Sequence, residues 1–273
     1  MERAMSQNTV ASYCSDVAFF LDSYGGRLEE LKPGDIEDFL CSRDWLSKRS
    51  QARLLSSIRS FCTWLVLEGL LADNPCDRVD GPKLGRYIPE VLSVEEVFDM
   101  IGAVDVSSWS GLRDRALLEV LYGCGLRVSE AVGLKVQNLY LDEGFVRIIG
   151  KGNKERLVPI GEAASDALTA YLEERPAEFS ACGNVFINRY GTPFSRVSIF
   201  KTVRKMAQAA GVHKDISPHT LRHSFATHLI ENGADIRFVQ DMLGHECVST
   251  TEIYTHIDTS TWHTSIREHH PRR

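Results

Sequence analysis

Six side chains of the kinds that act on phosphate groups stand from about the middle of this chain of 273 residues onward. They are Arg127, Lys151, His219, Arg222, His245 and Tyr254. The last four stand close together, in the runs His-Thr-Leu-Arg-His and Leu-Gly-His and at the tyrosine that follows. That stretch holds no serine or cysteine arranged as an activated nucleophile, which leaves the tyrosine as the attacking group. The set predicts metal-free attack on a phosphodiester.

The positive charges are what such a reaction requires. A phosphodiester carries one negative charge and gains more on its non-bridging oxygens as a nucleophile adds, so fixed cationic donors must point at those oxygens. The planar fork of an arginine matches phosphate geometry, whereas a lysine ammonium is a compact point charge. Many nucleases use divalent ions held by clustered carboxylates instead. No such cluster accompanies these residues, so we expect no metal and no other cofactor.

A tyrosine nucleophile has its own consequences. The reference pKa of a tyrosine hydroxyl is about 10, so Tyr254 must pass its proton to a base or to the substrate as it attacks. The resulting phosphotyrosine keeps the phosphodiester linkage, and a sugar hydroxyl can reseal the strand without a nucleotide cofactor. Lys151, in a turn between two predicted strands, is suited to protonate the departing oxygen as a general acid.

These residues and the runs around them resemble the active-site signature of the tyrosine recombinases, the phage integrase family. The stretch 219–229 and the runs 232–237, 240–245 and 250–256 are similar to the Xer type of this family almost residue for residue. The closing run 269–272 also resembles the tail of Xer proteins. The resemblance therefore covers nearly the whole chain.

The resemblance implies a role for each residue. Tyr254 would attack the scissile phosphate to give a 3′-phosphotyrosine and a free 5′-hydroxyl. Arg127 and Arg222 would hold the phosphate, and Lys151 would protonate the 5′-oxygen.

The remaining members of the signature would support these steps. His219 would assist proton transfer at the nucleophile, and His245 would hydrogen-bond a non-bridging oxygen. Glu130, one helical turn after the first arginine, would support the arginine pocket. We expect His223 and His228 to be structural, since they follow the active-site segment along its helix.

Taken singly, the same residues have simpler explanations. His219 and His223 have the spacing of zinc ligands, but the glutamate of the metalloprotease pattern is absent between them. Arg127 could cap the helix that ends at Gly123, and Lys151 could be a solvated turn residue. A lone tyrosine near a helix end is more often a core or surface aromatic than a nucleophile. The ordered set of six favours catalysis over these alternatives.

Apolar spacing predicts that residues 1–80 form a small helical domain, and the resemblance implies a core-binding, SAM-like fold for it. Helices are expected over 10–24, from Pro33 to Leu40 and over about 47–68. Prolines and glycines at 74–75, 81–83 and 89 mark a linker, which we assign to residues 81–89.

Residues 90–273 are predicted to form the catalytic domain. Ser93 and Glu96 suggest a capping box that opens one helix. Another helix ends at Gly123, and a turn at Gly125 leads to Arg127 at the start of the next.

A β-hairpin is expected in the same domain. The runs 145–149 and 156–160 are β-rich and are joined by a Gly-Lys-Gly-Asn turn with Lys151 at its tip. Helices follow to the end. The predicted fold class is mostly α with a small antiparallel sheet: a helical first domain and a mixed α/β catalytic domain.

The formal net charge of −6 is unusual for a chain that binds nucleic acid, because phosphate neutralisation drives such binding. An acidic exterior can coexist with a basic groove. In the first domain the candidates for that groove are Arg43, Lys48, Arg49, Arg53 and Arg59. In the second they are Lys151, Lys154, Arg156, Lys201, Arg204 and Lys205.

The cysteines at 14, 41, 62, 76, 124, 182 and 247 include no Cys-x-x-Cys pair and are predicted to be reduced core residues of a cytoplasmic protein. The sequence has no recognisable leader and no apolar run long enough to cross a bilayer, so no membrane association is expected.

The resemblance implies a site-specific DNA recombinase with a role in chromosome partition at cell division. Four protomers would assemble on two sites in double-stranded DNA and exchange strands through a Holliday junction, resolving chromosome dimers at a dif-like site. The assembly would be a homotetramer, or a heterotetramer with a second Xer-type recombinase, and a septal DNA translocase is a further candidate partner. The tail, with Ile257, Trp262 and Ile266 at helical spacing, is expected to dock on a neighbouring subunit.

Two alternatives stay open. An integrase of a mobile element, or an enzyme like a type IB topoisomerase, would use the same chemistry for a different outcome. A DNA-binding protein that has lost activity would show at least one altered catalytic position, and all six are filled. The resemblance also implies a helix upstream of Ser6, so the first domain is expected to be short by one element.

Overall fold

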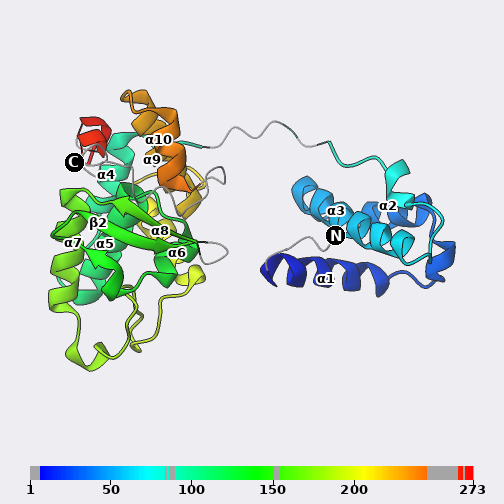
Figure 1. Cartoon of the computed structure of the whole chain (residues 1–273), viewed down its shortest axis with the longest axis horizontal. Helices are drawn as coiled ribbons and strands as arrows, with labels where there is room; N and C mark the ends of the chain where they lie inside the picture. The colour runs from blue at the N-terminus through cyan, green and yellow to red at the C-terminus, as the bar shows by residue number, and fades with distance from the viewer. Residues whose placement is uncertain are drawn as a thin grey trace. The chain divides into compact units, whose positions relative to one another are not determined.

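The computed structural model describes residues 7–83, 85, 90–150, 154–244, 264–266 and 268–272. It divides into two compact units, Met1–Ile88 and Pro89–Arg273 (Figure 1). The boundary between them falls within the segment that the sequence analysis assigns to the linker. Each unit has its own hydrophobic core.

The first unit is a small helical bundle, as the apolar spacing predicted. Its elements are α1 (Gln7–Leu21), η1 (Leu28–Glu30), α2 (Pro33–Cys41), α3 (Lys48–Leu67) and η2 (Pro75–Arg78). Ser47 caps α3 by accepting a hydrogen bond from the Ser50 amide at 3.2 Å. α1 packs against α3, and Phe20, Ile36 and Ile58 are almost fully buried between the helices.

The residues around Asn74 and Pro75 are part of this core, which corrects their interpretation as linker. Pro75 and Cys76 are buried, and the Asn74 side chain accepts a hydrogen bond from the Cys76 amide at 3.0 Å. The Asn74 amide donates to the backbone oxygen of Arg59 at 3.1 Å, which ties the turn to α3. A local helix-breaking signal cannot tell a linker from a turn that folds back onto its own domain.

The second unit is mostly helical around one small sheet. Its elements are α4 (Val94–Gly102), α5 (Trp109–Gly123), α6 (Val128–Gly133), η3 (Val136–Asn138), β1 (Leu139–Tyr140), β2 (Phe145–Ile149), β3 (Glu155–Pro159), α7 (Glu162–Glu174), η5 (Ala177–Phe179), α8 (Arg196–Ala209), α9 (Pro218–Glu231) and α10 (Ile236–Leu243). The Ser93–Glu96 capping box at the start of α4 is confirmed. α5 lies at the centre, where it packs against α7 and α9.

The predicted hairpin is confirmed as β2 and β3, which pair antiparallel (Figure 1). The turn residues 151–153 lie outside the described residues, so Lys151 does too. β1 joins the other edge of β2 and makes the order β1-β2-β3. β1 was not predicted, because a strand of two residues is too short to show an alternating pattern.

The C-terminal tail packs on its own domain. Ile266 belongs to the core of the second unit, and His270 is buried against the rings of Tyr122 and Phe225. In the single chain, Ile266 is thus buried in its own domain, and docking of the tail on a neighbouring subunit stays a prediction. Ile257 and Trp262, the other members of that prediction, lie outside the described residues.

The described cysteines divide between core and surface, with Cys182 half-buried, and Cys247 lies outside the described residues. Cys62, Cys76 and Cys124 are buried, as predicted. Cys14 and Cys41 are exposed, which corrects the prediction for them. Both sit on helices, α1 and α2, at positions that face away from the core, and composition alone does not distinguish the two faces of a short helix.

Candidate active site

Arg127 stands at the beginning of α6, directly after a tight turn. Gly125 makes this turn with φ +58°, and an added Cβ there would lie 2.5 Å from a ring carbon of Phe225. Only glycine meets both conditions without strain. The Arg127 amide then donates to the Glu130 carboxylate at 2.8 Å, which caps α6. The arginine therefore begins this helix and does not cap the one that ends at Gly123.

Arg222 is presented by α9, whose first turn carries His219. Ser217 and Pro218 fix the start of this helix as N-cap and first residue. His219 is exposed, whereas Arg222 is 8% exposed. Its Nη1 donates to the Gly125 oxygen at 2.6 Å. The spacing of the histidine and the arginine places both on one side of α9, with the histidine at the rim.

The C-terminal end of α10 supplies acceptors for the arginines. The helix closes at Gly244, in the left-handed conformation with φ +65°. The Leu243 oxygen accepts a hydrogen bond from Arg222 Nη2 at 2.5 Å, and the Gly244 oxygen accepts one from Arg127 Nη2 at 3.2 Å. This end of a helix dipole is negative and favours cations.

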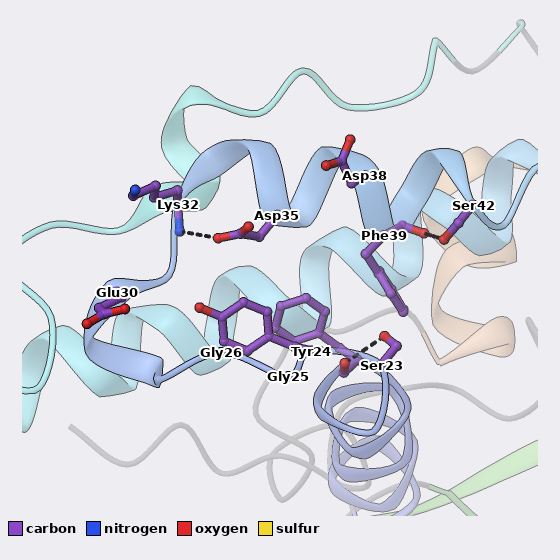
Figure 2. Close-up of a pocket in the computed structure, with 11 residues that line it drawn as sticks. Ser23, Tyr24, Gly25, Gly26, Glu30, Lys32, Asp35, Asp38, Phe39 and Ser42 are labelled. Carbon is purple, nitrogen blue, oxygen red and sulfur yellow. Dashed lines mark hydrogen bonds between the residues drawn. The ribbon is translucent and has the colours of Figure 1, made fainter.

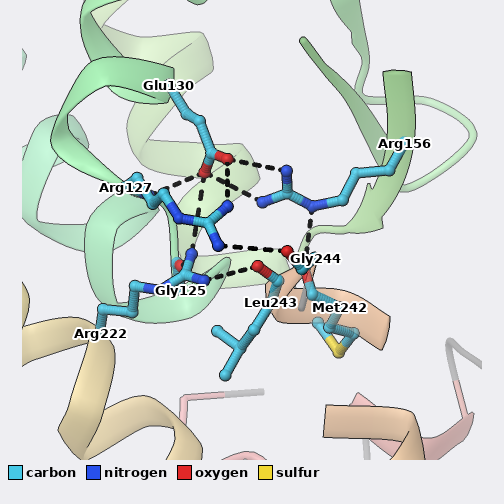
Figure 3. Close-up of polar contacts among 8 residues, drawn as sticks. All are labelled: Gly125, Arg127, Glu130, Arg156, Arg222, Met242, Leu243 and Gly244. Carbon is cyan, nitrogen blue, oxygen red and sulfur yellow. Dashed lines mark hydrogen bonds and ion pairs between the residues drawn. The ribbon is translucent and has the colours of Figure 1, made fainter. Parts of the chain in front are cut away.

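Glu130 is the buried carboxylate to which the cations converge (Figure 3). It accepts from Arg127 Nη1 at 3.0 Å, and from Arg156 Nη1 and Nη2 at 2.8 and 2.9 Å. Arg222 Nη1 lies 3.8 Å from Glu130 Oε2, the oxygen that also accepts from Arg156 Nη2. One carboxylate among three guanidiniums leaves the cluster with a net positive charge, as an anion-binding site requires.

The pKa values agree with this arrangement. Burial acts to raise the pKa of Glu130, but Arg156 and then Arg127 outweigh it through hydrogen bonds and charge, and the pKa of this carboxyl lies below its ordinary value. Burial, and then repulsion by Arg127, lowers the pKa of Arg222 to about 10. Arg222 thus stays protonated at neutral pH, and a bound phosphate would relieve the repulsion between the two arginines.

The structure brings together three of the predicted site residues, Arg127, Glu130 and Arg222, with His219 nearby along α9. Lys151, His245 and Tyr254 lie outside the described residues. Lys151 and His245 each directly follow a described glycine in the chain. Gly150 precedes Lys151 and donates its amide to the Lys154 oxygen at 2.7 Å, and Gly244 precedes His245.

Arg156 belongs to this cluster, which corrects its assignment to an open DNA groove. Its side chain is only 14% exposed. The signal for this lies in the strand alternation: Arg156 is opposite Ile148 in the register and shares a face of β3 with Val158, and both of these are buried.

Three of the predicted DNA-binding arginines of the first unit contact their own domain. Arg43 lies over the rings of Phe19 and Phe39. Arg53 forms an ion pair with the buried Asp16. Arg59 donates to a backbone oxygen of η2, as a structural residue would. Lys48 and Arg49 are exposed in the first turn of α3.

Four other predicted DNA-binding residues of the second unit, Lys154, Lys201, Arg204 and Lys205, are exposed. Lys154 follows the hairpin turn, and Lys201 and Lys205 lie along α8. Arg204, on the same helix, pairs with Asp215 at 2.9 Å.

A cavity of about 600 Å³ in the first unit is lined mainly by acidic side chains among its charged residues, in contrast to the basic surface residues (Figure 2). Glu30, Asp35 and Asp38 contribute carboxylates to its lining, beside the rings of Tyr24 and Phe39. Asp35 also accepts from the backbone amide that precedes α2, at 2.9 Å. Among the described residues of the lining, Lys32 is the one basic residue, so the carboxylates outnumber it and this cavity disfavours phosphate.

Within the described part of the chain, no group of three or more histidine, cysteine, aspartate or glutamate side chains is arranged to hold a metal ion. None of the described helices is both long and apolar enough to cross a membrane.

Comparison with known proteins identifies the family. Residues 90–261 match the phage integrase family, and residues 1–69 match the N-terminal SAM-like domain of phage integrases. A tyrosine recombinase XerD of Chlorobaculum tepidum is 46% identical over all of this chain and 93% of that protein. The XerD of Listeria monocytogenes is 40% identical over all of this chain and 95% of that protein.

Solved structures give the same fold. The crystal structure of a XerA recombinase is 31% identical, with a TM-score of 0.55, over 98% of this chain and 94% of that one. A XerH site-specific recombinase bound to palindromic difH substrate is 24% identical, with a TM-score of 0.73, over 94% of this chain and 78% of that one. With its family match and its full-length relatives, the protein belongs to the phage integrase family and is a tyrosine recombinase, an enzyme that cleaves and rejoins DNA.

Proposed function

We propose that this chain is a XerD-type site-specific recombinase that resolves chromosome dimers at a dif-like site in double-stranded DNA. The observation that carries the proposal is the cluster of Arg127 and Arg222 around the buried Glu130, since two fixed guanidiniums with a net positive charge suit a phosphodiester. The names of the full-length relatives, and the difH substrate of the XerH recombinase, support the choice of site.

Cleavage would begin with Arg127 and Arg222 on the non-bridging oxygens of the scissile phosphate. The described contacts occupy two of the five N–H groups of each guanidinium, which leaves donors for the substrate. The same contacts hold both side chains in place before the DNA arrives. Preorganisation of this kind is the largest single contribution to many acyl and phosphoryl transfers.

Bond exchange would follow at the phosphorus. The Tyr254 oxygen forms a bond to phosphorus, and the bond to the 5′-oxygen breaks, which leaves a 3′-phosphotyrosine. His219 accepts the proton of the phenol, Lys151 gives a proton to the departing 5′-oxygen, and His245 donates a hydrogen bond to a non-bridging oxygen. A 5′-hydroxyl from another strand reverses these steps and completes the exchange.

Assembly would place four protomers on two DNA sites, joined through a Holliday junction. The solved relatives include a lambda integrase tetramer bound to such a junction, and that protein has the same fold. The partners would be further copies of this chain or a second Xer-type recombinase, with a septal DNA translocase as regulator. The exposed Lys48, Arg49, Lys154, Lys201 and Lys205 would contact DNA phosphates.

A nicked duplex that carries a dif-like site tests the chemistry. Once the strand is cut, the short fragment beside the nick diffuses away, and the protein stays attached to DNA as a covalent adduct. We expect wild-type protein to form this adduct in the presence of a metal chelator, and Tyr254→Phe to form none, with its DNA affinity unchanged. Tyr190→Phe, at an exposed tyrosine of the same domain, is the matched control. Adduct formation by Tyr254→Phe would remove this residue from the proposed role.

An integrase of a mobile element is a second candidate, because the integrase of mycobacterium phage Brujita is 27% identical over 99% of this chain, with a TM-score of 0.57. Recombination assays separate the two candidates. The dimer-resolution proposal predicts exchange between two identical sites from the terminus region of the host chromosome. Exchange only between two different attachment sequences would favour the integrase.

A further inference from the structure

We infer that Arg156 is a positioning residue for DNA cleavage, which ties the hairpin that carries Lys151 to Glu130 and to the end of α10. The inference rests on the proposed function, because it assigns to Arg156 the alignment of the general acid with the phosphate-holding arginines. This role differs from the DNA-groove assignment of the sequence analysis, in which the Arg156 side chain would contact DNA directly.

Arg156 lies on β3, and its contacts reach two other elements, α6 and α10 (Figure 3). From β3, its two terminal nitrogens bind both oxygens of Glu130 in α6, at 2.8 and 2.9 Å. Its Nε donates to the Met242 oxygen near the end of α10, at 3.0 Å. Arg156 therefore uses all three of its nitrogens within the protein, and its 14% exposure leaves little surface for a DNA phosphate.

The glycines beside Arg156 place it between two catalytic segments. A Cβ added to Gly244 would lie 3.3 Å from Arg156 Nη1 and 3.4 Å from its Cδ. A Cβ added to Gly150 would lie 3.6 Å from Nη1. The guanidinium thus fits closely between the residue that precedes Lys151 and the residue that precedes His245. A shift of this side chain would release the hairpin, and with it the residue that precedes Lys151, from its fixed position relative to the arginines of α6 and α9.

Chemistry explains why an arginine is needed here. A planar fork can bind both oxygens of a carboxylate and still donate a third hydrogen bond in the same plane, whereas a lysine ammonium provides one point of attachment. The hydrogen bond and the charge of Arg156 are also the largest of the contributions that lower the pKa of Glu130. Arg156→Lys keeps the positive charge but loses this hydrogen-bond geometry, so its effect reports on the positioning of the site and not on the loss of a charge.

The test compares two leaving groups in the nicked-duplex assay. One substrate has the natural 5′-oxygen at the scissile phosphate, and the other has sulfur in its place. A thiol has a reference pKa of about 8.5, so sulfur departs without help from a general acid, whereas the oxygen requires a proton. Single-turnover rates of adduct formation are measured on both substrates for each variant.

We expect Arg156→Lys to slow cleavage of the oxygen substrate by about 10- to 100-fold, since a misplacement of about 1 Å can cost about 10²-fold. On the sulfur substrate its rate should return to within about 3-fold of wild type. Lys151→Ala should show the same pattern as a reference for the general acid. Arg222→Lys should be slow on both substrates, because the leaving group does not replace a phosphate contact.

The matched control is Arg147→Lys on the neighbouring strand. Arg147 faces the other side of the sheet, and its Nε and Nη2 donate to Asn138 Oδ1 at 3.1 and 2.7 Å. We expect wild-type rates from this variant. Because rescue by sulfur requires an intact site, it also shows that a slow Arg156→Lys protein is folded.

Two results would overturn the inference: wild-type cleavage of the oxygen substrate by Arg156→Lys, or a loss that sulfur does not restore. The second would assign Arg156 to phosphate binding or to stability alone. Failure of the proposed function has a different signature, because wild-type protein would then form no adduct with either substrate, or Tyr254→Phe would form one.

Discussion

At the scale of single residues, Glu130 sets the orientation of the arginines. A buried carboxylate is costly unless it is paired and fully hydrogen-bonded. Here Arg127 and Arg156 provide the pairing, and the Arg127 amide adds a further bond at 2.8 Å. The same bonds restrict the rotamers of the guanidiniums, so the energy of burying the acid is linked to preorganisation of the phosphate site.

Glu130→Gln keeps the size of the side chain and removes its charge. We expect the single-turnover cleavage rate to fall by about 10- to 100-fold, because charge-assisted hydrogen bonds of about 1.5–3 kcal/mol become neutral ones. The free energy of unfolding in urea should also fall, by about 2–4 kcal/mol, since three guanidiniums lose their common anion. Glu178→Gln, at an exposed position of η5, is the control. A cleavage rate equal to wild type would show that the arginines keep their geometry without the carboxylate.

At the scale of elements, α5 and the C-terminal tail depend on each other. The buried Tyr122 of α5 shares a hydrogen bond with His228 Nδ1 of α9 at 2.8 Å, and its ring also lies against His270 of the tail. Arg272 of the tail donates through Nε to the buried Glu119 of α5 at 2.9 Å. The tail therefore closes one side of the core, and its packing responds to the charge of the buried histidine.

The free energy of unfolding should fall as the pH is lowered from about 6.5 to about 4. Burial, and then the positive charges of His228 and Arg272, lowers the pKa of His270 to about 4. In the unfolded chain this imidazole takes up a proton near pH 6.5, so the unfolded state binds more protons between these pH values. The loss due to this group is on the order of 3 kcal/mol, complete below about pH 4.

Urea titrations across this pH range check the prediction. His270→Phe, which fills the same apolar site with a ring that does not titrate, should show a weaker dependence on pH. Burial also lowers the pKa of His228, which contributes in the same direction and remains in both proteins. An equal slope for the variant and the wild type would mean that His270 takes up its proton at the same pH in the folded and unfolded states.

At the scale of the whole molecule, a net charge of −6 must be reconciled with DNA as substrate. The negative charge is unevenly distributed: carboxylates line the cavity of the first unit, whereas Lys48 and Arg49 stand exposed at the start of α3. Affinity for phosphate depends on such local surfaces more than on the sum over the chain.

DNA binding should weaken steeply with salt, and single exposed cations should set the slope. We expect Lys48→Ala to lower affinity similarly for dif-like and unrelated duplexes and to reduce the slope of log K against log[salt] by about 1. Arg27→Ala, at an exposed arginine paired with Glu29 at 3.6 Å, should leave the slope unchanged. Fluorescence anisotropy at several salt concentrations measures both quantities. A Lys48→Ala slope equal to wild type would exclude a phosphate contact at this position.

The sequence by itself determined the local elements and the family. The capping box of Ser93 and Glu96, the turn at Gly125 and the hairpin of β2 and β3 depend on neighbours a few residues away, and these were predicted correctly. The order of arginines, histidines and tyrosine was enough for the family, which the comparisons confirm.

Only the tertiary structure decided which side chains meet. Arg156 binds the Met242 oxygen, 86 positions away in the sequence, and Arg272 binds the Glu119 carboxylate, 153 positions away. No local pattern encodes such pairs, because the spacing of apolar residues predicts a face of a helix or strand and not the partner that covers it. For that reason a cation assigned to an open groove proved to be buried in the site.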